Sequence, residues 1–95
     1  MKEKILCAAI WYDDGKEYFH QPQNIKTGYV ICGVRHTNCI SLHSLLTGLK
    51  TNASNVQGFV TDKNRFVDRN EGAEIAFKAA QIDKHRNLLY SEDLY

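Results

Sequence analysis

The first apolar run of the chain, from Ile5 to Tyr12, is almost continuous. A strand that is covered on both faces has this pattern, so the run predicts a central strand of a sheet. Asp14 and Gly15 follow it, and such a pair favours a tight hairpin turn. We therefore expect residues 17–20 to pair back antiparallel to the first strand. Residues 21–28, which contain the only proline, are expected to form a loop or a mobile excursion.

A second strand and a first helix are predicted next. The run from Tyr29 to Val34 is rich in β-branched residues, and Gly33 interrupts it in the manner of a bulge. Thr37 or Asn38 can cap a helix that continues to about residue 49. Its apolar face consists of leucines spaced i, i+3, i+4 and i+7, which are Leu42, Leu45, Leu46 and Leu49. Residues 49–56 are polar and predict a loop.

The stretch from Gln57 to Gln81 predicts a hairpin that leads into a second helix. A short strand opens at Phe59, residues 62–64 make a turn in which Asn64 can take a positive φ, and residues 65–67 return as a strand. Asp68 is then placed as the N-cap of the helix, with Glu71 three residues later in a capping-box spacing. The apolar face of this helix is made of small residues and one phenylalanine: Ala73, Ala76, Phe77 and Ala80.

The chain ends in a short apolar and acidic tail. Ser91 can cap a last turn, and Leu94 and Tyr95 are expected to dock on the body of the protein or on a neighbouring subunit, because an apolar terminus rarely hangs free. Together these elements predict a single domain over residues 1–95 of the α+β class. We expect a small antiparallel β-sheet packed with two α-helices, and a docked C-terminal tail.

Composition narrows the function. The net charge of +1 argues against binding of DNA or RNA polymers, which requires a concentrated basic surface. No apolar run approaches the length of a membrane span, and the N-terminus does not have the pattern of a signal peptide. We therefore expect a protein of the cytoplasm without a membrane partner.

The three cysteines predict neither a disulfide framework nor a zinc site, because their number is odd and they have no paired ligand spacing. Cys7 and Cys32 lie in apolar runs and are expected to be small buried hydrophobes, in keeping with a reducing compartment. A nucleophilic Cys39 beside His36 or His43 is conceivable, but the sequence shows no activating context for it.

The candidate chemistry lies at the predicted helix starts. Arg65 and Arg69 flank the cap of the second helix, where free N–H groups and the dipole attract anions. With Phe59 and Phe66 close in sequence, they could hold a phosphate and stack a base. The alternative, which the pattern alone favours, is that both arginines are ordinary surface cations and both phenylalanines belong to the core.

The first helix repeats this arrangement. Arg35 and His36 precede it, and a cation at a helix start is unfavourable unless an anion lies nearby. The arginines could share a bound anion, or carboxylates of the chain could pair with them, with Glu92 and Asp93 as the obvious partners. These two carboxylates could also accept ribose hydroxyls. His36 by itself is more typical of a hydrogen-bonded structural histidine.

The sequence GFVTDKNRFVDRNEGAEIAFKAAQI, followed by LYSEDLY, resembles the phage anti-Thoeris sponge family. The resemblance is good over residues 57–82 and the tail, and weak over the N-terminal strand. In that family the hairpin leads almost directly to the Arg-His pair, whereas here residues 20–32 intervene. The resemblance implies a phage protein that binds glycocyclic ADP-ribose, and in some members the cyclic oligonucleotides of CBASS defence, without cleaving them.

Carried onto this sequence, the resemblance implies a ligand site formed by Arg35, His36, Phe59, Arg65, Phe66, Arg69 and Asp93. A pyrophosphate needs guanidinium contacts and backbone donors, and adenine needs a flat partner. A chain of 95 residues has little room for a deep pocket, so we expect a homo-oligomer, a dimer or a dimer-based assembly.

Two alternatives remain open. The chain could be an interaction module of phage origin, an inhibitor that binds a host protein without a small-molecule pocket. It could also be a hydrolase in which His36 works with Asp68 or Glu71 as an acid–base pair. The sequence has no metal set, nucleophile elbow or glycine-rich phosphate loop, so we expect no enzyme and no cofactor.

Overall fold

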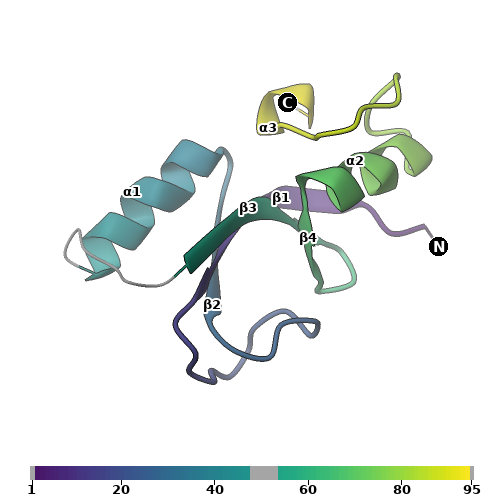
Figure 1. Cartoon of the computed structure of the whole chain (residues 1–95). Helices are drawn as coiled ribbons and strands as arrows, with labels where there is room; N and C mark the ends of the chain where they lie inside the picture. The colour runs from purple at the N-terminus through teal and green to yellow at the C-terminus, as the bar shows by residue number, and fades with distance from the viewer. Residues whose placement is uncertain (1, 48–53, 95) are drawn as a thin grey trace.

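A computed structural model of the chain describes residues 2–47 and 54–94. Four strands form one antiparallel sheet in the order β2-β1-β3-β4, accompanied by three helices (Figure 1). In chain order, the elements are β1 (Ile5–Asp13), β2 (Tyr29–Gly33), α1 (His36–Thr47), β3 (Ser54–Thr61), β4 (Phe66–Asp68), α2 (Arg69–Lys78) and α3 (Ser91–Leu94). The predicted α+β class, with two main helices and a docked tail, is confirmed.

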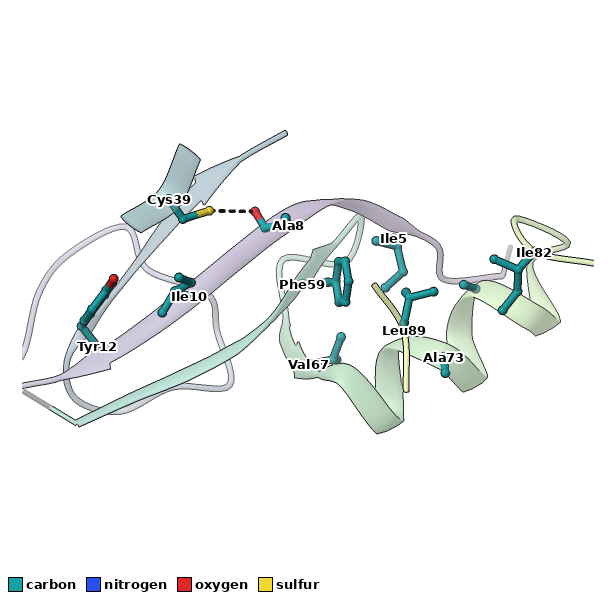
Figure 2. Close-up of a cluster of buried hydrophobic side chains, with 11 residues drawn as sticks. Ile5, Ala8, Ile10, Tyr12, Cys39, Phe59, Val67, Ala73, Ile82 and Leu89 are labelled. Carbon is teal, nitrogen blue, oxygen red and sulfur yellow. Dashed lines mark hydrogen bonds between the residues drawn. The ribbon is translucent and has the colours of Figure 1, made fainter. Parts of the chain in front are cut away.

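The helices cover one face of the sheet, and the core lies between them and the strands (Figure 1). Alternate residues of the central strand β1 point to this face, because side chains alternate along a strand. Figure 2 shows Cys39 of α1 beside Ala8, and Ala73 of α2 on the side of the core where Phe59 lies. The core consists of Ile5, Ala8, Ile10, Tyr12, Cys39, Phe59, Val67, Ala73, Ala76, Ile82 and Leu89.

The prediction that residues 17–20 pair with β1 is wrong. The turn itself forms, since Gly15 takes φ +79° and the Asp13 carboxylate accepts from its N–H. However, β2 occupies that edge of β1, with Tyr12 opposite Tyr29 and Ala8 opposite Gly33. Residues 17–20 do not pair along that edge, because five residues of β2 already pair with β1 there.

The connection from β1 to β2 crosses the face of the sheet opposite the helices and is held there by side chains (Figure 1). Trp11 Nε1 donates to Thr27 O at 2.9 Å. Asn24 makes a two-way pair with the backbone of Phe66, accepting at 2.7 Å and donating at 2.6 Å. The predicted loop is therefore present and is tied to β4.

β3 begins earlier than predicted, because residues 54–56 belong to the strand and not to a loop. Their polarity is compatible with a strand, since β4 pairs only with residues 58–60 and leaves the start of β3 at an edge. Gly58 is required at the point where β4 joins, because a Cβ there would lie 2.0 Å from Val67 O.

The predicted apolar face of α1 is wrong. The helix buries His36, Cys39 and His43, whereas Leu45 is 83% exposed and Leu46 67% exposed. The buried histidines are tolerated because their ring nitrogens find partners: His36 Nε2 meets Gly58 O at 2.8 Å, and His43 Nε2 meets the Tyr29 hydroxyl at 2.7 Å. Leu49, the last residue of the predicted face, lies outside the described residues.

The predicted start of α1 is nearly right. Asn38, one of the two predicted caps, uses its side chain in the reverse direction: its Oδ1 accepts from the N–H of Arg35, the residue before the helix, at 3.0 Å. This is the reciprocal half of a capping box.

The hairpin and α2 follow the prediction closely. Asn64 takes φ +57° in the turn, and Asp68 Oδ1 accepts from Glu71 N at 2.9 Å as the N-cap of α2. Ala73 and Ala76 are fully buried, so the helix lies close to the sheet. The predicted face ends early, because Phe77 is 41% exposed and Ala80 lies beyond the helix.

The tail docks as predicted, whereas Cys7, which is half-buried, and Cys32 are both less buried than predicted. Leu89 is fully buried, α3 begins at Ser91, and Leu94 packs against the core, whereas Tyr95 lies outside the described residues. Cys32, which we expected to be buried, is exposed, because its side chain points to the face of the sheet opposite the helices.

Candidate functional site

The starts of α1 and α2 meet over the middle of β3, with α3 above them (Figure 1). His36, the first residue of α1, contacts the carbonyl of Gly58. Arg69, the first residue of α2, contacts the side chain of Gln57, which is the residue before Gly58 in β3. Two positions that are distant in sequence are therefore brought together on adjacent residues of one strand.

Arg69 is held by three contacts. Its guanidinium donates to Leu89 O at 2.8 Å and to Gln57 Oε1 at 2.6 Å, and it lies 4.7 Å from the centre of the Tyr90 ring. A guanidinium over an aromatic face is a favourable arrangement. Arg69 thus links α2 to β3 and to the C-terminal segment, and its orientation is fixed before any ligand arrives.

His36 is a structural histidine in this fold. Its ring is 8% exposed and stands edge-on to Phe59, with 5.2 Å between ring centres. Burial lowers its pKa; the Gly58 carbonyl opposes this shift, the charge of Arg69 adds to it, and Glu92 opposes it. At neutral pH the ring is uncharged, and it contributes a hydrogen bond to the fold and no positive charge to a ligand site.

Beside this meeting point, a cleft of about 270 Å³ separates α1 from β3; we call it the α1–β3 cleft. Its aromatic side is built from Tyr12 and His43, whose rings stack with centres 3.5 Å apart and planes 2° from parallel. Gln57, which Arg69 contacts, belongs to its lining. The full lining is Ile10, Tyr12, Ile40, His43, Ser44, Asn55 and Gln57.

The chemistry of the cleft is that of neutral hydrogen bonds. Asn55 and Gln57 supply amides, Ser44 supplies a hydroxyl, and none of the described lining residues is a carboxylate. Burial lowers the pKa of His43, so its ring is uncharged at neutral pH and already hydrogen-bonded to Tyr29. Neutral amide and hydroxyl groups suit the polar edge of a small molecule better than a metal ion.

Arg65 lies away from this cleft and is paired within the chain. Its Nε and NH2 donate to the two carboxylate oxygens of Glu3, both at 2.8 Å, and NH2 also reaches Glu71 at 3.1 Å. Its hydrogen bond with Glu3 raises the pKa of Arg65, and the same bond lowers the pKa of Glu3 to about 2. Carboxylates do neutralise this arginine, but they are not the predicted Glu92 and Asp93.

The two phenylalanines of the predicted site belong to the core. Phe59 is fully buried on the helix-covered face, and Figure 2 shows it among Val67 and Leu89. Phe66 is 6% exposed and lies on the opposite face, with its ring centre 6.1 Å from that of Trp11. In this arrangement neither ring offers an open face on which a base could stack.

The remaining predicted residues lie apart from the cleft. Arg35 is half-buried directly before α1. Asp93 accepts from the N–H of Tyr90 at 3.0 Å and lies 3.6 Å from Arg86. Asp93 also lines a second hollow of about 430 Å³, formed by Ala80, Gln81, Ile82, Asp83, Arg86 and Asp93.

The cleft residues were missed because the start of β3 was interpreted as a loop. Asn55 and Gln57 are separated by one residue, and their alternation with Val56 is the period-two pattern of a half-exposed strand. That signal was present in the sequence. The stacking of Tyr12 on His43 depends on α1 turning its histidine face inward, and nothing local predicts it.

Two features are absent from the part of the chain that the structure describes: a cluster of metal ligands and a helix able to span a membrane. Over residues 2–47 and 54–94, no three side chains of the His, Cys, Asp or Glu type gather closely enough to hold a metal ion. Among the helices of the same residues, none has the length and apolar character that crossing a bilayer requires.

Comparison with known proteins identifies one family. Neither a curated protein nor a solved structure matches the sequence significantly. The sequence pattern of the family described as Phage T4 y16D protein matches residues 4–95, which is nearly the whole chain. The chain therefore belongs to the phage T4 y16D protein family.

Proposed function

We propose that this phage protein binds a cyclic nucleotide immune signal, such as glycocyclic ADP-ribose, and sequesters it without cleaving it. The observation that carries the proposal is the α1–β3 cleft, where the amides of Asn55 and Gln57 lie beside the fixed guanidinium of Arg69. Amides can pair with the edge of a base, and a preorganised arginine can hold a phosphate. The sequence resemblance to the sponge family supplies the ligand class.

The composition of the cleft supports binding and not hydrolysis. General acid–base catalysis needs a group that can exchange a proton with the substrate. Around the cleft the described titratable side chains are Tyr12 and His43, and these stack on each other. Tyr12 is 5% and His43 4% exposed, and His43 Nε2 is already hydrogen-bonded to the Tyr29 hydroxyl, so neither ring is placed to exchange a proton with a bound ligand.

The size of the cleft supports a homo-oligomer. Ligand pockets usually enclose about 300–1,000 Å³, so a cleft of about 270 Å³ holds only part of a dinucleotide-sized ligand. Ile40 lines the cleft and is 45% exposed. Leu42, Leu45 and Leu46 lie together on the outer side of the same helix, and we call these three residues the α1 leucine surface. A second copy that binds α1 through these residues could complete the pocket.

The test is calorimetry of the purified protein with glycocyclic ADP-ribose, followed by heating to release the ligand. We expect tight binding and recovery of intact ligand. Asn55→Ala should weaken binding about fivefold, because a ligand hydrogen bond is worth roughly 1 kcal/mol. The matched control is Asn87→Ala, which removes an exposed amide outside the cleft and should leave affinity unchanged.

Three results would count against the proposal. Absence of heat with glycocyclic ADP-ribose and with a cyclic dinucleotide would remove the sponge function. Recovery of a chemically altered nucleotide would indicate an enzyme. Equal loss of affinity in Asn55→Ala and Asn87→Ala would place the ligand elsewhere on the protein.

A second candidate is an interaction module that inhibits a host protein. The α1 leucine surface favours it, because α1 contains no charged residue and exposes Leu45 by 83%. Apolar, uncharged patches of this kind mark protein interfaces. In this case Asn55→Ala would have no effect on function, whereas a polar substitution at Leu45 would abolish it.

A further inference from the structure

Two cysteines lie side by side on the face of the sheet opposite the helices. Ala9 of β1 is paired with Cys32 of β2, so Cys7, two residues away on the same strand face, is a diagonal neighbour of Cys32. Both line an apolar hollow of about 520 Å³ whose other lining residues are Leu6, Gly33 and Val34. Cys32 is exposed and Cys7 is half-buried, so reagents in solution can reach the pair.

The two thiols lie on the same face of neighbouring strands, and each shifts the pKa of the other. The neighbouring Cys32 thiol lowers the pKa of Cys7 to about 7, and the Cys7 sulfur raises the pKa of Cys32. Near neutral pH a large fraction of Cys7 is therefore thiolate, the nucleophilic form of cysteine. A thiolate with a second thiol beside it is the arrangement of attacking and resolving cysteines in disulfide exchange.

Cys39 differs from this pair in both its exposure and its pKa. It is fully buried beneath α1, and its thiol donates towards Ala8 O at 3.7 Å, as Figure 2 shows. Burial raises its pKa, so it stays protonated. The chain thus contains a reactive pair and an inert cysteine that serves as an internal control.

We propose that Cys7 and Cys32 form a redox-active dithiol that exchanges with low-molecular-weight disulfides, such as glutathione disulfide, and closes to a cross-strand disulfide. The Cys7 thiolate attacks one sulfur of the small disulfide, which forms a mixed disulfide and releases one small thiolate. Cys32 then loses its proton to solvent and attacks the sulfur of Cys7, which releases the second small thiolate. The protein loses two electrons and two protons, and the small disulfide is reduced to two thiols.

The strand geometry makes this disulfide reversible. Diagonal neighbours on antiparallel strands have Cα atoms about 7–8 Å apart, whereas a disulfide prefers about 4.4–6.8 Å. The backbone at Cys7 has room to adjust, because the pairing of β1 with β3 changes register between Ile5 and Cys7. A disulfide closed against this separation is strained, and strained disulfides are the readily reduced ones.

The experiment is to incubate the full-length protein with graded mixtures of glutathione and glutathione disulfide, quench with an alkylating reagent and measure intact mass. Wild type should lose two hydrogens and accumulate no glutathione adduct. Cys32→Ser should accumulate one glutathione on Cys7, since the resolving thiol is missing. Cys7→Ser should react more slowly, and Cys39→Ser should behave like wild type.

Several outcomes would overturn the proposal. Wild type could stay fully alkylated under conditions that oxidise a model dithiol, or it could hold a stable adduct that never resolves. Equal reactivity of Cys7→Ser and Cys32→Ser would show that neither thiol is activated by the other. Because Cys32 is exposed, Cys32→Ser should not endanger the fold, and its circular dichroism spectrum is the check.

Discussion

The two main helices cover the same face of one sheet, and they use their side chains in opposite ways. α2 buries small apolar residues, Ala73 and Ala76, and exposes charged ones such as Glu74 to solvent. α1 buries His36, Cys39 and His43, contains no charged residue, and turns its leucines outward.

α1 therefore packs on the chain through one face and leaves an uncharged face with leucines exposed, whereas α2 packs on the sheet and also contacts the C-terminal segment. The inward face of α1 is satisfied within the chain, by the Gly58 carbonyl, the Tyr29 hydroxyl and the stack of His43 on Tyr12. Its leucines therefore contribute little to the fold of one copy. An uncharged apolar helix face is costly to leave in water, so its use is expected to lie outside the chain.

The largest effect is expected from the residue that both helices share. Phe59 is fully buried, meets the His36 ring of α1 edge-on, and lies against Gly72 of α2, where an added Cβ would come within 3.1 Å of it. Phe59→Ala should lower the free energy of unfolding by about 3–5 kcal/mol. Urea unfolding followed by circular dichroism and by Trp11 fluorescence measures this.

The same experiment tests whether the two helices unfold together. Coincident transitions by the two probes indicate a single cooperative unit. The control is Val56→Ala on β3, where the side chain is 41% exposed and the loss should be well under that at Phe59. A loss below about 1 kcal/mol at Phe59 would mean that this residue does not join the two halves of the core.

The contrast between the helices also separates what the sequence predicts from what it does not. α2 was predicted well because its signals are local: Asp68 caps the N–H of Glu71 three residues away, and the small residues fall on one face. α1 has an equally clear period, but its histidine face is buried only because Tyr12, Tyr29 and Gly58 are in place to receive it.

In the candidate site, too, contacts between residues that are distant in sequence are the ones that the sequence did not predict. The two helix starts approach each other through His36 and Arg69, which contact adjacent residues of β3. The partner of Arg65 could not be foreseen, because Glu3 is 62 residues away in sequence. The Asp14-Gly15 turn was predicted correctly, but its antiparallel return was not, because β2 pairs with the same edge of β1.

An intermediate effect is expected at the ion pair that anchors the α2 side. The folded-state pKa of Glu3 is about 2, against an ordinary value of 4.5, chiefly because of its hydrogen bond to Arg65. A lowered folded pKa stabilises the fold above pH 4.5, and this contribution is lost as the pH falls through about 2. With solvent screening at this partly exposed pair, we expect about 1–2 kcal/mol.

Glu3→Gln isolates this contribution from other acid effects. The variant should be less stable than wild type at neutral pH, and the difference should shrink as the pH falls and vanish below pH 2, where Glu3 is protonated in the folded state as well. Denaturant titrations across this range give the difference directly. A difference that is independent of pH would show that the stabilisation comes from packing and not from the charge of Glu3.

The smallest effect on folding, and the most informative about the comparison, is expected on the outer face of α1. Leu45→Gln with Leu46→Gln should change the free energy of unfolding by about 0.5 kcal/mol or less, because these side chains are 83% and 67% exposed. The same pair of changes should shift the protein from an assembly to a monomer in sedimentation velocity.

The matched control on α2 is Ala76→Leu, which overpacks a fully buried position and should cost about 1–3 kcal/mol while leaving the assembly intact. A wild-type protein that is monomeric at high concentration would contradict the homo-oligomer and leave the α1 leucine surface to a different protein. Changes on α1 should thus affect association and changes on α2 should affect stability. This opposite response would show that the outer face of α1 serves a contact with another molecule, whereas the buried face of α2 serves the fold.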